Sequence, residues 1–141
     1  MSFEPVETHR GVVVARNGAV AASQPLAVSA GLDALARGGT FADAALAASA
    51  VLCVVEPWAS HLGGDAFLIT FDARTRETLA FNGSGAAPRT ATREAYAANG
   101  IPERGLRAAT VPGLVSTWFA LHERFGSRPV ANALGAGSSM M

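Results

Sequence analysis

The sequence predicts an α+β fold in which antiparallel hairpins pack against helices. Two pairs of β-branched or aromatic runs, each joined by a short polar turn, indicate the hairpins. Two long apolar stretches follow one another without an intervening strand, which indicates helices that are grouped along the chain. Strands and helices that are grouped in this way are typical of α+β proteins and not of alternating α/β proteins.

The region expected to be folded begins after residues 1–10, which are interpreted as a loose leader. A β-branched run at 11–15 is followed by Asn17-Gly18 and by a second apolar run at 19–22. Asn-Gly favours a type I′ turn, because both central positions of that turn need positive φ. The pattern therefore predicts a hairpin over residues 11–22.

Two helices are predicted next. Ser23 is a candidate N-cap for the first, and Gly38-Gly39 ends it because glycine accepts the left-handed backbone at a helix end. Thr40 begins the second helix, and Asp43 three positions later completes a capping-box pattern. The stretch 41–55 is apolar on all sides, which predicts a helix covered by other layers.

The second half of the chain predicts another hairpin and another helix. The hairpin joins the runs 66–71 and 78–81 and leads into a flexible Gly/Ser loop at 82–85. A short helix is expected near 93–99. Pro112-Gly113 opens the last helix, whose apolar residues recur at near-helical spacing.

Composition excludes several classes of function. Half of the residues are hydrophobic, 16% are charged, and 11 basic residues balance 11 acidic ones, so no basic surface indicates nucleic acid or anionic lipid as a partner. No signal peptide is seen and the apolar run 42–55 is too short to span a bilayer, so a cytoplasmic protein is expected. The three histidines lack ligand spacing, so no metal or cofactor is predicted, and Cys53 is interpreted as a buried apolar residue.

Three motifs stand in order along the chain. Residues 30–45 read AGLDALARGGTFADAA, and residues 54–57 and 61–67 read VVEP and HLGGDAF. Residues 110–115 read TVPGLV. Together these motifs resemble the γ-glutamyltransferase (γ-glutamyltranspeptidase) family, because their order and spacing agree with its large-subunit motifs over about four fifths of the chain.

The resemblance implies the N-terminal part of an N-terminal-nucleophile hydrolase, whose fold is an αββα sandwich and is incomplete here. Members are precursors that cut themselves, and the new N-terminal threonine of the small subunit attacks an amide with its α-amino group as base. That threonine is expected far beyond this chain, so no catalytic residue is assigned. The implied partners are the missing small-subunit half and a small-molecule amide or γ-glutamyl substrate.

The family also implies a carboxylate-binding arginine, four positions before a proline. Here Ser84 stands four positions before Pro88, and no arginine lies between Phe81 and Pro88. We therefore predict that Asn82 and Ser84 hydrogen-bond a smaller amide or acyl substrate and that Arg89 compensates only by a different path. The structural alternative is a solvated turn.

Two hypotheses on the whole chain follow. Residues 11–129 form a γ-glutamyltransferase-like region, and 130–141 form an irregular tail that is expected to mark a truncation or a frame change. In the first hypothesis the chain is the inactive first part of an amide-cleaving or acyl-transferring enzyme. In the second it is a catalytically dead binding module that folds alone or with itself.

Overall fold

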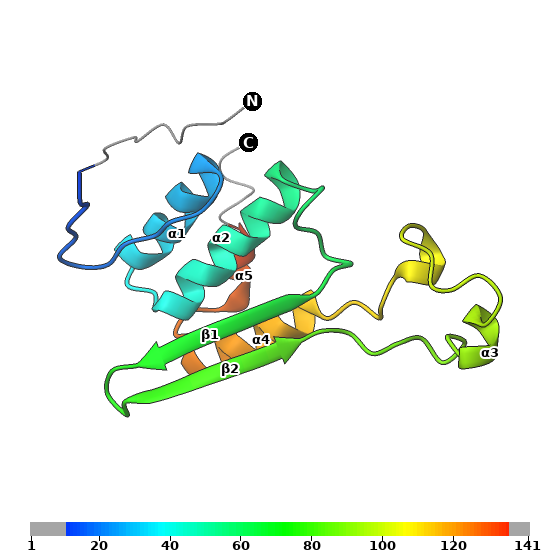
Figure 1. Cartoon of the computed structure of the whole chain (residues 1–141). Helices are drawn as coiled ribbons and strands as arrows, with labels where there is room; N and C mark the ends of the chain where they lie inside the picture. The colour runs from blue at the N-terminus through cyan, green and yellow to red at the C-terminus, as the bar shows by residue number, and fades with distance from the viewer. Residues whose placement is uncertain (1–10, 136–141) are drawn as a thin grey trace.

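The computed structural model describes residues 11–135, and the predicted leader at 1–10 lies outside them. A body of helices and one hairpin carries an arm, residues 86–110, that projects from the end of the hairpin (Figure 1). In chain order the elements are α1 (Pro25–Ala36), α2 (Phe41–Val55), β1 (Ala66–Asp72), β2 (Glu77–Gly83), α3 (Arg93–Tyr96), the 3₁₀ helix η1 (Leu106–Ala108), α4 (Leu114–Phe125) and α5 (Val130–Gly135). The predicted α+β class is confirmed.

Helix α2 is the centre of the body, as its apolar sequence predicts. It packs against α1, α4 and α5, and its residues Ala42, Leu46 and Ala47 have no exposed surface. The predicted capping box is present, because the Asp43 carboxylate accepts from the Thr40 N–H at 2.8 Å while the Thr40 hydroxyl accepts from the Asp43 N–H at 3.4 Å. Trp118 of α4 completes the core and donates from Nε1 to Ser49 Oγ at 3.0 Å.

The hairpin predicted over 11–22 is wrong, since this segment has no strand. Gly18 does take the positive φ that the Asn-Gly turn requires, at 136°. Nearly all side chains of the segment are exposed, so the two runs would form a two-stranded ribbon with little buried surface, and such a ribbon is marginal in water. Within the described residues, the Asn-Gly turn alone is therefore not enough to pair the two apolar runs as strands.

The start of α1 and the tail also differ from the predictions. Gln24, not Ser23, occupies the N-cap position without a side-chain cap, and the Ser23 hydroxyl donates to Glu56 instead. The tail predicted as irregular contains α5, which buries Ala133 against the core, whereas residues 136–141 lie outside the described part. Six residues are too few to display a helical period, which explains why the pattern missed α5.

The second hairpin is confirmed and extends slightly beyond its predicted ends. Strands β1 and β2 pair antiparallel from Ala66 opposite Gly83 to Asp72 opposite Glu77. One face, which includes Leu68 and Phe81, packs on the core with α4 behind it (Figure 1). The opposite face is exposed in the described structure. In residues 11–135, no helix is both long enough and apolar enough to cross a membrane.

Candidate functional site

Three loops that are distant in sequence meet at the end of the β1–β2 hairpin where α4 begins. The carbonyl oxygen of Gly64 accepts from the N–H groups of Gly113 and Leu114, at 3.0 and 2.9 Å. The N–H of Val111 donates to the carbonyl of Ala86 at 3.0 Å. The Gly63-Gly64 loop, the loop after β2 and the segment before α4 are thus joined by backbone hydrogen bonds. We call this junction the hairpin-end site.

Glycines make this junction possible, because the backbones approach too closely for side chains. A Cβ on Gly85 would lie 1.5 Å from the carbonyl oxygen of Val111, and one on Gly113 would lie 2.0 Å from that of Gly83. Contacts below 3.0 Å are not tolerated unless something shifts, and here the obstacle is backbone. The glycines of the motifs therefore serve the geometry of the site.

Asp65 fastens the polar side of the site. Its Oδ1 accepts from the Gly85 N–H at 2.9 Å, and its Oδ2 accepts from the Thr110 hydroxyl at 3.2 Å. One carboxylate therefore holds both the loop after β2 and the segment before α4. Sequence reasoning missed Asp65 and Thr110 as site residues, although each stands inside a motif that indicated the family resemblance.

The structure brings two of the three predicted substrate-binding residues together. Asn82 Oδ1 accepts from the Ser84 N–H at 3.0 Å, so both side chains belong to one exposed turn of the hairpin-end site. Arg89 lies further on, in the exposed turn after Pro88. Across residues 11–135, no hydrogen bond or ion pair joins Arg89 to that turn, and the Ser84 hydroxyl has no protein partner.

The chemistry open to this turn is binding rather than bond breaking. Asn82 offers an amide donor, and Ser84 offers a hydroxyl that donates and accepts, so both suit a polar uncharged group. Neither has a base within hydrogen-bond distance in the described region. Residues 11–135 contain no group of three His, Cys, Asp or Glu side chains that could hold a metal ion.

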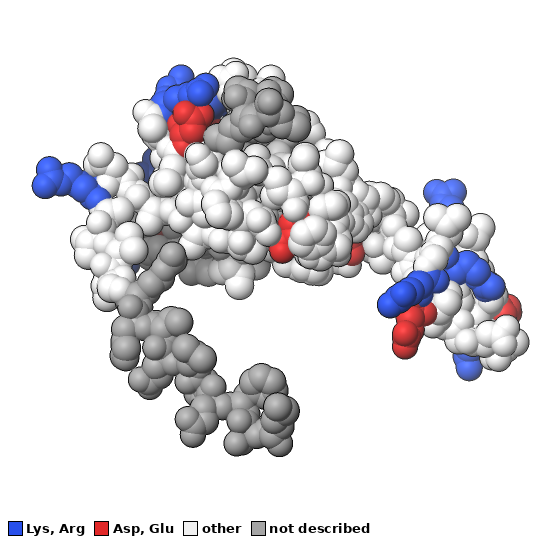
Figure 2. Space-filling model, turned by 90° about the horizontal axis from the view of Figure 1, so that it is seen from above, with Lys and Arg blue, Asp and Glu red and all other residues white. Residues whose placement is uncertain are grey.

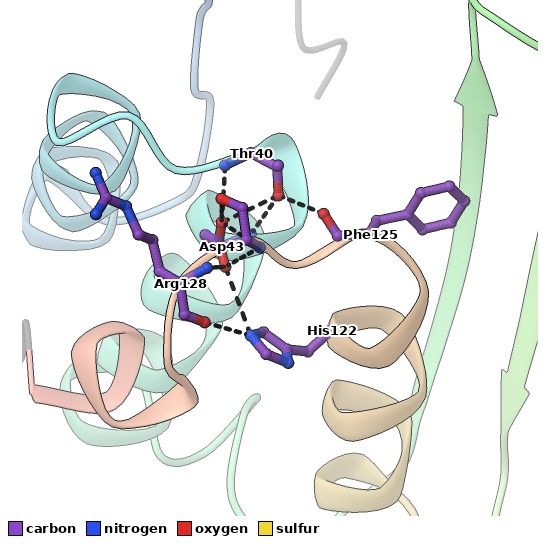
Figure 3. A network of polar contacts seen from close by, with 6 residues as sticks. Thr40, Asp43, His122, Phe125 and Arg128 are labelled. Carbon is purple, nitrogen blue, oxygen red and sulfur yellow. Dashed lines mark hydrogen bonds and ion pairs between the residues drawn. The ribbon is translucent and has the colours of Figure 1, made fainter.

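A second polar cluster lies at the start of α2, beside the C-terminal end of α4 (Figure 3). Asp43, only 2% exposed, accepts from the Ser127 hydroxyl at 2.9 Å and lies 3.8 Å from His122 Nε2. The Thr40 hydroxyl also donates to the Phe125 carbonyl at 2.7 Å. Burial raises the pKa of Asp43, but hydrogen bonds from Thr40 and Ser127 outweigh it and lower this pKa overall.

This second cluster is occupied by its own protein donors. The carboxylate is surrounded by N–H and O–H groups from α2 and from the connection between α4 and α5. Its role is to fasten that connection to the helix start, and the hairpin-end site remains the candidate for ligand binding.

The part of the chain that contains these motifs also matches known proteins. The family model described as gamma-glutamyltranspeptidase matches residues 27–137. The glutathione hydrolase-like YwrD proenzyme of Bacillus subtilis is 42% identical over 111 residues, which are 77% of this chain and 21% of that protein. The oxamate amidohydrolase proenzyme of Klebsiella pneumoniae is 41% identical over 107 residues, 74% of this chain and 20% of that protein.

Solved structures agree with the sequence comparison. A cephalosporin acylase from Bacillus halodurans superposes with a TM-score of 0.85 and 39% identity, covering 97% of this chain and 27% of that one. The gamma-glutamyltranspeptidase of Helicobacter pylori superposes with a TM-score of 0.84 and 29% identity, covering 92% and 39%. The chain spans about a fifth of the length of the curated relatives it matches, and nothing in the comparisons supports a stand-alone binding module.

Proposed function

The chain belongs to the gamma-glutamyltranspeptidase family, and we propose that it is the N-terminal part of an amide-cleaving or acyl-transferring hydrolase of that family. The observation that carries the proposal is the convergence of two motif segments, residues 61–67 and 110–115, and the loop at 82–85 on one hydrogen-bonded junction. The glycine backbone, the Asp65 carboxylate and an exposed polar turn lie together at the hairpin-end site. This arrangement fits a substrate wall that another part of the protein completes.

The functional groups of the turn determine which roles we assign to this chain and which to the rest of the protein. Asn82 and Ser84 bind and orient the substrate, while the nucleophile and its base come from the other part of the protein. A hydroxyl nucleophile needs a base that takes its proton, and the turn offers none. The isolated 141-residue chain is therefore expected to show no amidase turnover, and turnover by it would contradict this assignment.

The proposed substrate is a small amide or acyl compound rather than a γ-glutamyl donor. An arginine fork recognises a carboxylate through two parallel hydrogen bonds, and Ser84 occupies the position where the resemblance places that arginine. A serine hydroxyl makes shorter-range, uncharged contacts. Beside relatives named as glutathione hydrolases, the matches include an oxamate amidohydrolase and a cephalosporin acylase, and these two support a substrate without the γ-glutamyl group.

The test is to assemble the chain with the remainder of its protein and to compare kcat/KM for oxamate with kcat/KM for a chromogenic γ-glutamyl anilide. We expect the small amide to be preferred. Ser84→Arg restores an arginine four positions before Pro88 and is expected to raise kcat/KM for the γ-glutamyl anilide at least tenfold, the value of one charge-assisted pair.

The matched control is Thr75→Arg, which adds the same side chain in the exposed turn between β1 and β2. This control is expected to leave both kcat/KM values unchanged within twofold. A wild-type preference for the γ-glutamyl anilide, combined with no effect of Ser84→Ala on either substrate, would contradict the proposed role of the turn.

A further inference from the structure

The arm contains a cavity that the proposed function does not use. It has a volume of about 470 Å³ and lies between α3 and the segment that returns to α4. Small-molecule sites in proteins are typically concave, about 300–1,000 Å³ in volume, and mostly apolar with a few polar groups. The lining of this cavity follows that pattern, with Pro88 and Ile101 among its apolar residues and Arg93 and Arg107 among its polar ones.

The cavity carries positive charge without a counterion. No Asp or Glu is among its lining residues, whereas two arginines are. The arm as a whole has four arginines and two glutamates between residues 86 and 110. Figure 2 shows this lobe as a concentration of charged side chains at one end of a mostly uncharged surface. Within residues 11–135, the side chain of Arg93 has no hydrogen-bond or ion-pair partner.

Arg107 is held in place at the wall of the same cavity. Its guanidinium carbon lies 4.9 Å from the centre of the Tyr96 ring, and its Nη2 donates to the Ala95 carbonyl. The Tyr96 hydroxyl donates back to the Arg107 carbonyl at 2.8 Å. An arginine that is already ordered loses less side-chain entropy when it binds a ligand, and its remaining N–H groups stay available.

We propose that this cavity binds the carboxylate group of a small organic anion, with Arg107 as the fixed donor and Arg93 as the second cation. The apolar lining contacts the carbon part of the ligand, which is why an organic carboxylate fits better than an inorganic anion. Thr110 lines the cavity and also donates to Asp65, so the cavity adjoins the hairpin-end site.

The test measures glutarate binding to the full 141-residue chain by isothermal titration calorimetry at low ionic strength. Saturable binding is expected, and Arg93→Gln is expected to weaken it at least tenfold because one charge-assisted partner is lost. The side chain of Arg93 makes no described polar contact with the protein, so this variant should fold normally. Arg107→Gln is expected to cause a similar loss, with circular dichroism to check that the arm remains folded.

The matched control is Arg104→Gln, which removes the same charge from the same arm at a residue that does not line the cavity. It is expected to change the dissociation constant less than twofold. The proposal is overturned if wild type does not bind glutarate or if Arg104→Gln and Arg93→Gln weaken binding equally. Equally tight binding of neutral glutaramide or of inorganic phosphate also overturns it. Because binding is measured without turnover, its failure is distinguishable from failure of the proposed enzymatic function.

Discussion

At the scale of single residues, Asp43 is the side chain that takes part in the most hydrogen bonds within residues 11–135. It is 2% exposed and accepts hydrogen bonds from Thr40, Ser127 and Arg128. The contact with Thr40 was predicted because a capping box is a local pattern of four residues. The contacts with Ser127 and Arg128 join positions 84 and 85 residues apart, and no local pattern could indicate them.

Replacing Asp43 is expected to destabilise the protein strongly. Asp43→Asn keeps the shape of the side chain but leaves donors from Thr40 and Ser127 poorly paired in a buried place. The expected loss in the free energy of unfolding is about 2–4 kcal/mol, measured by urea denaturation. Asp33→Asn is the control, since it breaks only an exposed i,i+4 pair with Arg37 and should cost less than about 0.5 kcal/mol. Equal losses would contradict the importance of the buried network.

The same residue predicts how stability depends on pH. Because its folded-state pKa is lowered, the unfolded chain binds the proton more tightly and stability falls as the medium is acidified. The contribution is complete above the unfolded pKa, near about 4, and is lost as pH falls through the folded value. Urea midpoints of wild type should therefore drop between about pH 5 and pH 2.5 more steeply than those of Asp43→Asn. If the urea midpoints of wild type and Asp43→Asn fell equally steeply with pH, the predicted contribution of Asp43 would be contradicted.

Cys53 packs against the apolar core, as the sequence predicts. It lies partly buried against the core, and burial raises the pKa of its thiol. Since the thiolate is the reactive form, alkylation by iodoacetamide at pH 7.5 is expected to be at least tenfold slower in the folded chain than in 6 M guanidinium, on the order expected for an inert buried thiol. Rates that are equal in the two states would show that Cys53 is accessible and not part of the core.

At the scale of elements, helices α1, α2 and α4 and the second hairpin were predictable because each has its own periodicity or turn chemistry, whereas the short helix α5 was missed. The junction at the hairpin end was not. Its glycines at 83, 85 and 113 look like ordinary loop residues in the sequence. Only the folded chain shows that Gly85 lies against the backbone of Val111 and that Gly113 lies against that of Gly83. The same reason explains why Asp65, whose partners are 20 and 45 residues away, was missed.

The junction therefore gives a clear prediction. Gly85→Ala places a Cβ 1.5 Å from the Val111 carbonyl oxygen, so β2 and the start of α4 must separate. A loss of more than about 3 kcal/mol in the free energy of unfolding is expected, as for severe overpacking. Gly11→Ala has nothing within 4 Å and serves as the control, with a change below about 0.5 kcal/mol. Thermal denaturation followed by circular dichroism distinguishes the two.

At the scale of the whole molecule, the described body leaves one apolar sheet face uncovered. Phe67, Ile69 and Phe71 on the outer face of β1 are 69%, 81% and 60% exposed. The hairpin that carries these residues was predicted from the sequence, but their exposure depends on which layers are present. Contiguous exposed apolar residues on a strand favour association.

The isolated chain is accordingly expected to self-associate through this face. Ile69→Lys should reduce the weight-average mass in analytical ultracentrifugation and reduce the fluorescence of a bound hydrophobic dye, because it places a charge at the centre of the patch. Thr75→Lys adds the same charge in the β1–β2 turn and should leave association unchanged. If Thr75→Lys is as effective as Ile69→Lys, added charge alone explains the change, and the face is not the contact.

The two ends of the arm cross close together, where the Val111 N–H donates to the Ala86 carbonyl and where Asp65 accepts from Gly85 and Thr110. Both ends of the segment are therefore fixed whatever lies between them. For a loop with fixed ends, each doubling of length costs only about 0.6 kcal/mol of closure entropy. Residues between Pro88 and Ala109 are thus free to change in length and composition while the crossing stays intact. Such a crossing lets ligand preference diversify through insertion and deletion without changing the scaffold.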